Sequence, residues 1–196
     1  MANQGPAYYS PYPAATYEGI ITPPEGKALL LSDIVDEEVA MREVAKVMMT
    51  SENATIFPGP QVLYGFNEEA KKKATLIKEM AEVLNAKMIP MYDYRPKYPK
   101  IDAEVEINPN HPNLTIWHNN IKAAIFIGVH CHYANVALKI VRAETDCYTV
   151  AICGLSGHED AMATLRDQHS SELERFIKIA KEVKAELENS VGDDIE

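Results

Sequence analysis

The stretch KAAIFIGVHCHYANVALKIV, residues 122–141, decides the fold class. The apolar segment 123–129 fits a buried strand and is interrupted by Gly128. The residues that follow contain an apolar stripe at helical spacing, made of Tyr133, Val136, Ala137, Ile140 and Val141. A buried strand that turns directly into an amphipathic helix is typical of a parallel sheet covered by helices.

The rest of the chain repeats this alternation. Helices are predicted at 36–49, at 68–84 with Asn67 as its cap, and at 172–188, and further strands at 54–59, 86–91, 114–118 (as an edge strand) and 148–154. Ser156 with Glu159, and Ser171 with Glu174, fit capping boxes that would each open a helix. The pattern predicts an α/β fold, with a mostly parallel sheet and helices on both faces.

Composition divides the chain into three parts. Residues 1–26 form a proline- and tyrosine-rich arm, 27–190 a single α/β domain, and 191–196 an acidic tail. Proline makes the arm extended, and tyrosine is enriched at interfaces. We therefore interpret the arm as a partner-binding segment, against the alternatives of an unstructured tail or an arm packed on its own domain. The candidate contacts are Tyr8, Tyr9, Tyr12 and Tyr17.

Charge and cysteine content limit the classes of function. The formal net charge is -10, which argues against nucleic acid and anionic membranes as partners. The three cysteines form no C-x-x-C pair, which favours a reducing compartment. We find no signal-peptide pattern and no apolar segment of membrane-spanning length, so we expect a cytoplasmic protein.

Glycine corners follow three of the predicted strands. In a parallel sheet these corners share the carboxyl edge, where ligands bind, and helix starts there favour anions. The residues predicted to contact a nucleotide or flavin are Gly59, Gly128, His130, His132, Gly154 and Ser156. Neither G-x-G-x-x-G nor a P-loop motif is present, so these corners lack a standard nucleotide signature.

The His130–Cys131–His132 turn has three interpretations. The first is a metal site. Adjacent residues point in different directions, so they rarely bind one metal together. Cys153 and His158 could approach the turn, but their spacing matches no zinc motif. The second interpretation is structural, with the histidines bonded to backbone groups and Cys131 buried, and the third is a turn that contacts a ligand or a partner. We predict no metal site and no catalytic residues, and we keep a small enzyme using Cys131 or His130 as the least favoured alternative.

The segment FIGVHCHYANVAL, residues 126–138, resembles the epsilon (small, beta-family) subunit of the archaeal carbon monoxide dehydrogenase/acetyl-CoA synthase complex. The helix–strand order over 36–91 and the strand YTVAICG, 148–154, are similar too. The resemblance implies a Rossmann-like domain, similar to the NAD/FAD-binding domain of deoxyhypusine synthase. It implies a non-catalytic accessory subunit, with two copies each of this chain and of a large nickel–iron–sulfur catalytic subunit, and FAD as a candidate cofactor for electron transfer.

The residues themselves support the absence of an intrinsic metal cluster. An iron–sulfur cluster normally needs four protein ligands, and the chain has three cysteines. The main alternative to an accessory subunit is a stand-alone flavin- or nucleotide-binding protein that uses the same glycine corners.

Overall fold

The computed structural model describes residues 22–63, 65, 67–91, 111–167 and 169–193, with side chains up to 190. Most of the predicted arm, including Tyr8, Tyr9, Tyr12 and Tyr17, lies outside the described residues, as does most of the long connection after Met91. The predicted tail overlaps the end of the last helix, which reaches Asp193.

Among the described residues, seven strands form one sheet in the order β2-β1-β7-β6-β5-β3-β4. Strands β3 to β7 are parallel to one another, while β1 and β2 form an antiparallel hairpin that joins the sheet beside β7. The prediction of a mostly parallel sheet is confirmed. The strands are β1 (Lys27–Leu30), β2 (Asp33–Asp36), β3 (Thr55–Pro58), β4 (Lys87–Met88), β5 (Ala123–Ile127), β6 (Tyr148–Ile152) and β7 (Ala163–Leu165).

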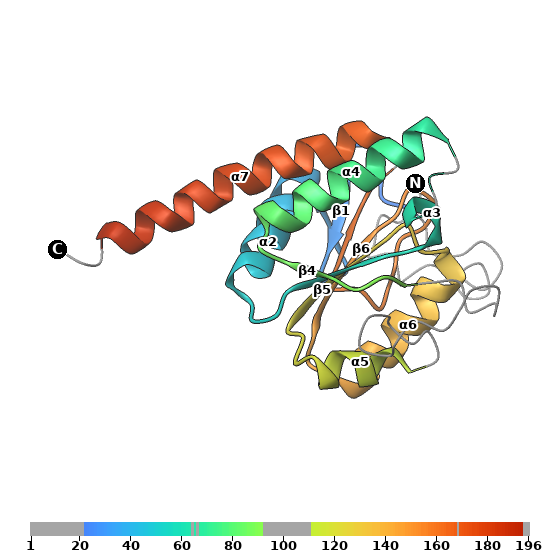
Figure 1. Ribbon diagram of the computed structural model, residues 1–196. Helices are drawn as coiled ribbons and strands as arrows, with labels where there is room; N and C mark the ends of the chain where they lie inside the picture. The colour runs from blue at the N-terminus through green and yellow to red at the C-terminus, as the bar shows by residue number, and fades with distance from the viewer. Residues whose placement is uncertain (1–21, 64, 66, 92–110, 168, 194–196) are drawn as a thin grey trace.

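Helices cover both faces of the sheet, as expected (Figure 1). One face carries α2 (Glu37–Thr50), α4 (Glu68–Val83) and α7 (Ser170–Asp193), and the other carries α5 (Pro112–His118) and α6 (Cys131–Glu144). Each face has its own apolar cluster, because alternate residues of a strand point to opposite sides. In β5, for example, Ile125 belongs to the first cluster and Phe126 to the second.

The order of the parallel strands reverses between β3 and β5. The chain passes from β3 through α4 to β4 on one side, and β5 then pairs on the other side of β3. Helices that leave the sheet in opposite directions from such a point create a crevice at the carboxyl edge of the strands. This reversal locates the part of the sheet where a ligand site is expected. A short helix, α3 (Pro60–Leu63), lies at this edge.

The edge strand predicted over 114–118 is wrong, because these residues belong to helix α5. Pro112 lies in the first turn, where its missing N–H costs nothing, and Asn119 N donates to Thr115 O at 3.2 Å. A segment of five residues is too short for periodicity to distinguish a strand from a helix turn.

The helix predicted to start at Ser156 is also wrong. Ser156 Oγ donates to Gly157 O at 2.8 Å, so it does not cap a helix at this point. The chain instead reaches β7 through an irregular connection, because β7 supplies the strand that pairs with both β6 and β1. A capping box reflects only local hydrogen bonds, whereas the path of the chain here is decided by the pairing of β7 with β6 and β1.

The hairpin β1–β2 was not predicted. Its turn residues, Leu31 and Ser32, both have positive φ, at 48° and 76°. Positive φ at both central residues is the geometry of a type I′ turn, which normally uses Asn-Gly. Leu-Ser therefore gives no sequence signal for the turn. No helix among the described residues is long and apolar enough to cross a membrane.

Candidate functional site

A pocket of about 420 Å³ opens at the carboxyl edge of the sheet, beside the reversal in strand order. Its walls are α3, the first turns of α4, the corner after β5, the start of α6, the corner after β6 and one residue after β7. This volume suits a small ligand or part of a dinucleotide. The lining residues used below are Lys73, Cys131, Cys153, Leu155 and Asp167.

Two glycines set the position of this pocket. Gly128 has φ +67°, and a Cβ there would lie 2.7 Å from Val62 Cγ2. Gly59 N donates to Ile127 O at 2.8 Å, and a Cβ on Gly59 would lie 2.7 Å from Val129 Cα. The backbones after β3 and β5 are therefore in direct contact. The open volume lies instead toward the β6 corner, where Cys153, Gly154 and Leu155 line it.

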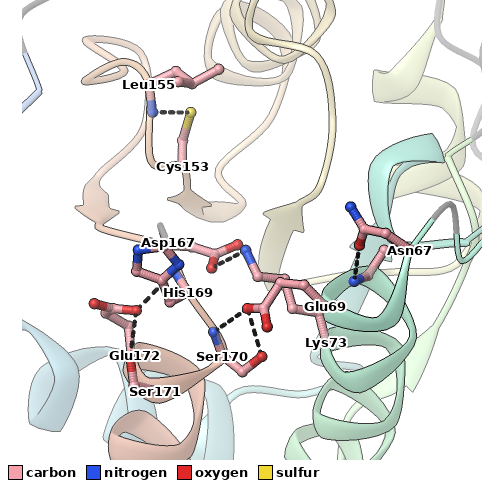
Figure 2. A network of polar contacts seen from close by, with 11 residues as sticks. Asn67, Glu69, Lys73, Cys153, Leu155, Asp167, His169, Ser170, Ser171 and Glu172 are labelled. Atoms are coloured by element: carbon pink, nitrogen blue, oxygen red, sulfur yellow. Dashed lines mark hydrogen bonds and ion pairs between the residues drawn. The ribbon is translucent and has the colours of Figure 1, made fainter.

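A buried ion pair forms part of the pocket wall. Lys73 Nζ, from α4, lies 2.8 Å from Asp167 Oδ1, after β7 (Figure 2). Only 14% of the lysine side chain and 7% of the aspartate side chain are exposed. Burial raises the pKa of Asp167 above its ordinary value, while Lys73 acts in the opposite direction. This pair places a carboxyl that is hard to ionise beside the pocket.

Neighbouring polar contacts join α4, which carries Lys73, to the start of α7, which follows Asp167 in the chain. Glu69 Oε1 accepts from Ser170 N at 2.6 Å and from Ser170 Oγ at 2.7 Å, which ties the start of α7 to α4 (Figure 2). These hydrogen bonds lower the pKa of Glu69. Asn67 Oδ1 accepts from Ala70 N at 2.8 Å, so the predicted cap of α4 is confirmed.

Two sulfur atoms and an imidazole meet near the corner after β6. Cys131 Sγ lies 3.5 Å from Cys153 Sγ, and one ligand atom each of Cys131, Cys153 and His158 lies within 4.8 Å of the others. Cys131 is the first residue of α6, Cys153 follows β6 directly, and His158 lies in the connection to β7. The His158 ring is buried, and its Nδ1 lies 2.7 Å from Asn135 Oδ1.

The two thiols differ in acidity because they share a hydrogen bond. A hydrogen bond from Cys131 lowers the pKa of Cys153, and His158 and the N–H of Leu155 act in the same direction against burial. The same contact raises the pKa of Cys131. Cys153 therefore ionises more readily beside Cys131 than it would without this hydrogen bond.

The structure separates the six residues predicted to bind a cofactor. Gly128 and Gly154 line the pocket, and Gly59 packs behind it against the corner after β5. Ser156 is buried and lies outside the lining. His130 and His132 stack on each other with ring centroids 5.7 Å apart, also outside the lining. Cofactor binding by these residues stays a prediction.

Residues 18–183 match one protein family, described as CO dehydrogenase beta subunit/acetyl-CoA synthase epsilon subunit. The chain belongs to this family. The resemblance noted for residues 126–138 is thereby confirmed. A comparison with curated proteins found no match. The family match spans the whole sheet, the pocket and the sulfur–imidazole cluster, and it ends inside α7.

Sequence reasoning missed Lys73, Glu69 and Asp167. Lys73 stands in a run of three lysines with Lys71 and Lys72, a pattern typical of a solvated face, and the two neighbours do make exposed ion pairs. Its position was the available signal, because Lys73 lies one turn from both Ala70 and Ile77 on the buried side of α4. Asp167 gave no signal, because only the fold brings it to α4.

A larger hollow, of about 660 Å³, lies on another part of the surface. Leu31, Met162 and Cys147 are among its lining residues, together with ion pairs that Lys139 and Arg142 make with Asp160. It adjoins the first residues of β6 and thus the amino edge of the parallel strands, whereas ligands of such sheets bind at the carboxyl edge. We therefore take the smaller pocket as the candidate functional site.

Proposed function

We propose that this chain is a non-catalytic accessory subunit of a nickel–iron–sulfur CO dehydrogenase complex, in which it stabilises the catalytic subunit. The observation that carries the proposal is family membership over residues 18–183. The cysteine count supports it, because three cysteines do not complete the usual four-ligand set of an iron–sulfur cluster. The redox metals of the reaction then belong to the partner.

Exposed apolar side chains support a role in binding another protein. Among the described residues, Trp117 of α5 and Val136 of α6 are each more than half exposed, and these two helices contact each other on one face of the sheet. We propose that the tyrosine-rich arm adds to this contact, with two copies of each subunit in the complex. Tyrosine provides a large contact area with little loss of conformational entropy.

Co-purification from the source cells tests the accessory role. We expect this chain to elute with a large nickel–iron–sulfur protein, at equal copy numbers, and the catalytic subunit to lose activity faster on warming when this chain is absent. Replacement of Tyr8, Tyr9, Tyr12 and Tyr17 by serine is expected to weaken assembly, whereas replacement by phenylalanine, which keeps the rings, should preserve it. A chain that elutes alone would contradict the proposal.

We further propose that the pocket binds the ring of a flavin within a Rossmann-like domain. The reversal in strand order beside the pocket supports this, as does an apolar wall that includes Val62, Val129 and Leu155. The charged lining residues are Glu69, Asp167 and Lys73, which together disfavour phosphate inside the pocket. The ring fits this lining better than the phosphates do. A bound flavin would supply electron transfer in single steps.

Flavin titration separates this part of the proposal from the accessory role. We expect riboflavin, FMN and FAD to bind with similar affinity, because the ring is the part recognised. Leu155→Glu, at a pocket residue that is 77% exposed, should weaken binding. Leu31→Glu makes the same change at a residue that is 67% exposed and lines the other hollow. It should bind flavin normally, and equal loss in both variants would contradict the assignment.

The second candidate is a stand-alone flavin- or nucleotide-binding protein, favoured by the same pocket at the carboxyl edge. It predicts tight flavin or nucleotide binding by the isolated chain and no co-elution with a catalytic subunit. Co-elution with a catalytic subunit but without any flavin would support the accessory role and contradict flavin binding.

A further inference from the structure

We propose that Cys131, Cys153 and His158 form a binding site for one thiophilic divalent cation, of the zinc type. Two thiolates and an imidazole are a ligand set that suits Zn²⁺. The residues come from three separate pieces of the fold: the start of α6, the end of β6 and the connection to β7. The proposal does not rest on flavin binding or on the accessory role.

The distances agree with a tetrahedral site. With zinc–sulfur bonds of about 2.3 Å, two thiolates in a tetrahedron lie about 3.8 Å apart, and a thiolate and an imidazole nitrogen about 3.6 Å apart. The two sulfur atoms are 3.5 Å apart, and all three ligand atoms lie within 4.8 Å of one another. Metal binding therefore requires only small rotations of side chains that are already adjacent.

The histidine is oriented as a metal ligand. Asn135 Oδ1 accepts a hydrogen bond from His158 Nδ1 at 2.7 Å, which places the ring proton on Nδ1. The lone pair of Nε2 is then available to a metal. Metal-binding histidines usually donate their second ring N–H to such an acceptor, which fixes the tautomer and the ring plane. The residue is only 2% exposed, so the surrounding atoms hold the ring in place.

Backbone groups near both sulfur atoms favour negative charge, although the shared hydrogen bond and burial raise the pKa of Cys131. Cys131 occupies the first position of α6, where free backbone N–H groups and the helix dipole favour negative charge. Leu155 N donates to Cys153 Sγ at 3.4 Å (Figure 2). Binding of the cation would release the remaining thiol protons to solvent and leave both sulfurs bonded to the metal.

The open coordination position would face the pocket. Cys131 and Cys153 both line the pocket, whereas His158 lies behind them. Three protein ligands and one open position are typical of zinc sites that bind water or a substrate, whereas structural sites have four protein ligands. The site would therefore present a metal-bound water, or a sulfur or oxygen atom of a ligand, to the pocket.

Cobalt substitution tests the proposal in the full chain under a phosphine reductant, which keeps all cysteines as thiols. We expect one Co²⁺ per chain, with thiolate-to-cobalt charge-transfer absorption and the strong visible bands of tetrahedral cobalt. Zn²⁺ should displace the cobalt and abolish both signals. Cys131→Ser, Cys153→Ser and His158→Gln should each remove most of the charge-transfer absorption or shift it clearly.

Two matched controls distinguish this site from adventitious binding. Cys147→Ser alters the third cysteine, which lies in the buried cluster on the α5–α6 face, and should leave the spectrum unchanged. His132→Gln alters the stacked pair of histidines beside the site and should also leave it unchanged. A spectrum that persists in Cys131→Ser and Cys153→Ser, or that is lost in His132→Gln, would overturn the proposal.

A measurement on the unmodified chain covers the case in which a variant fails to fold. Zn²⁺ should slow the alkylation of Cys131 and Cys153 at least tenfold, as followed by peptide mass spectrometry, and leave the rate at Cys147 unchanged. Equal rates with and without zinc would refute the site. Asn135→Ala should keep the cobalt spectrum but weaken affinity by about 10- to 100-fold, because Asn135 acts by positioning His158.

Discussion

At the scale of single residues, Lys73 shows how burial changes the role of a charge. Lys71 and Lys72 pair with Glu68 and Glu174 on the surface, but Lys73 turns inward to Asp167. A buried pair that loses one partner leaves an uncompensated charge, which is costly, whereas exposed pairs contribute little. The three lysines are adjacent in sequence but have different energetic roles.

We expect Lys73→Met to destabilise the protein by about 3 kcal/mol at pH 7 and by less at pH 4. The pKa of Asp167 in the folded protein is raised above 3.8, so its contribution to stability is complete below that pH and is lost as pH rises through the folded pKa. Removal of the ammonium raises this pKa further, and the loss therefore grows toward pH 7. Urea unfolding at both pH values measures it.

Lys72→Met is the matched control for this prediction. It removes a neighbouring lysine whose ion pair with Glu174 is exposed, so the urea midpoint should hardly change at either pH. An equal loss of stability at pH 4 and pH 7 in Lys73→Met would contradict the role given to Asp167.

Gly59 provides a second test at this scale. Gly59→Ala should cost about 3 kcal/mol of unfolding free energy, because the new methyl group meets rigid backbone at the corner after β5. Gly26→Ala is the control, since Gly26 has φ +73° but no heavy atom within 4 Å of a Cβ. It should cost about 1 kcal/mol from backbone strain alone. Chemical denaturation measures the unfolding free energy of both variants. A loss for Gly59→Ala no larger than that for Gly26→Ala would contradict the close approach at this corner.

At the scale of elements, the β1–β2 hairpin tests turn chemistry. Its turn uses Leu31 and Ser32 at positive φ, whereas the fold uses asparagine at its three other non-glycine positions of this kind among the described residues: Asn53, Asn85 and Asn120. An L-residue other than glycine, asparagine or aspartate pays a steric cost there. The hairpin is held despite this cost because β1 also pairs with β7.

The double change Leu31→Asn with Ser32→Gly should stabilise the isolated chain by about 1 kcal/mol. Asn-Gly is the preferred sequence of a type I′ turn, so the same backbone forms with less strain. The thermal midpoint measures the gain. Asn85→Leu makes the reverse change at an exposed left-handed position and should lower the midpoint. No gain in the midpoint from the double change, or no loss from Asn85→Leu, would contradict the strain argument.

At the scale of the whole molecule, α7 has two parts. Its first part, up to Val183, packs on α2 and α4 and contributes Phe176, Ala180 and Val183 to the apolar cluster. The part after Val183 extends beyond the rest of the domain (Figure 1). After Val183, the described side chains are exposed apart from the half-buried Leu187.

A chain that ends at Glu188 should therefore unfold at the same urea concentration as the full chain. A chain that ends at Glu182 also loses Val183 and Leu187, and we expect it to be less stable by about 2 kcal/mol. Equal stability of the two shortened chains would show that α7 contributes nothing beyond Glu182.

The sequence was sufficient to predict elements whose apolar pattern is long or unambiguous. Strand β5 and helices α2, α4 and α6 lie close to their predicted positions, because burial on one face imposes a period that residues reveal directly. Short elements such as α5 and β7 were missed, because a few residues carry no clear period and their conformation follows from neighbours distant in sequence.

The sequence by itself determined an α/β chain with its glycine corners at the carboxyl edge and a resemblance to one family. Only the tertiary structure decided which side chains share the pocket. Lys73 meets Asp167, and Cys131 meets Cys153 and His158, because parallel strands bring the ends of separate segments to one edge. These contacts join residues from separate segments of the chain, and the number of residues between them does not indicate how close they lie in space.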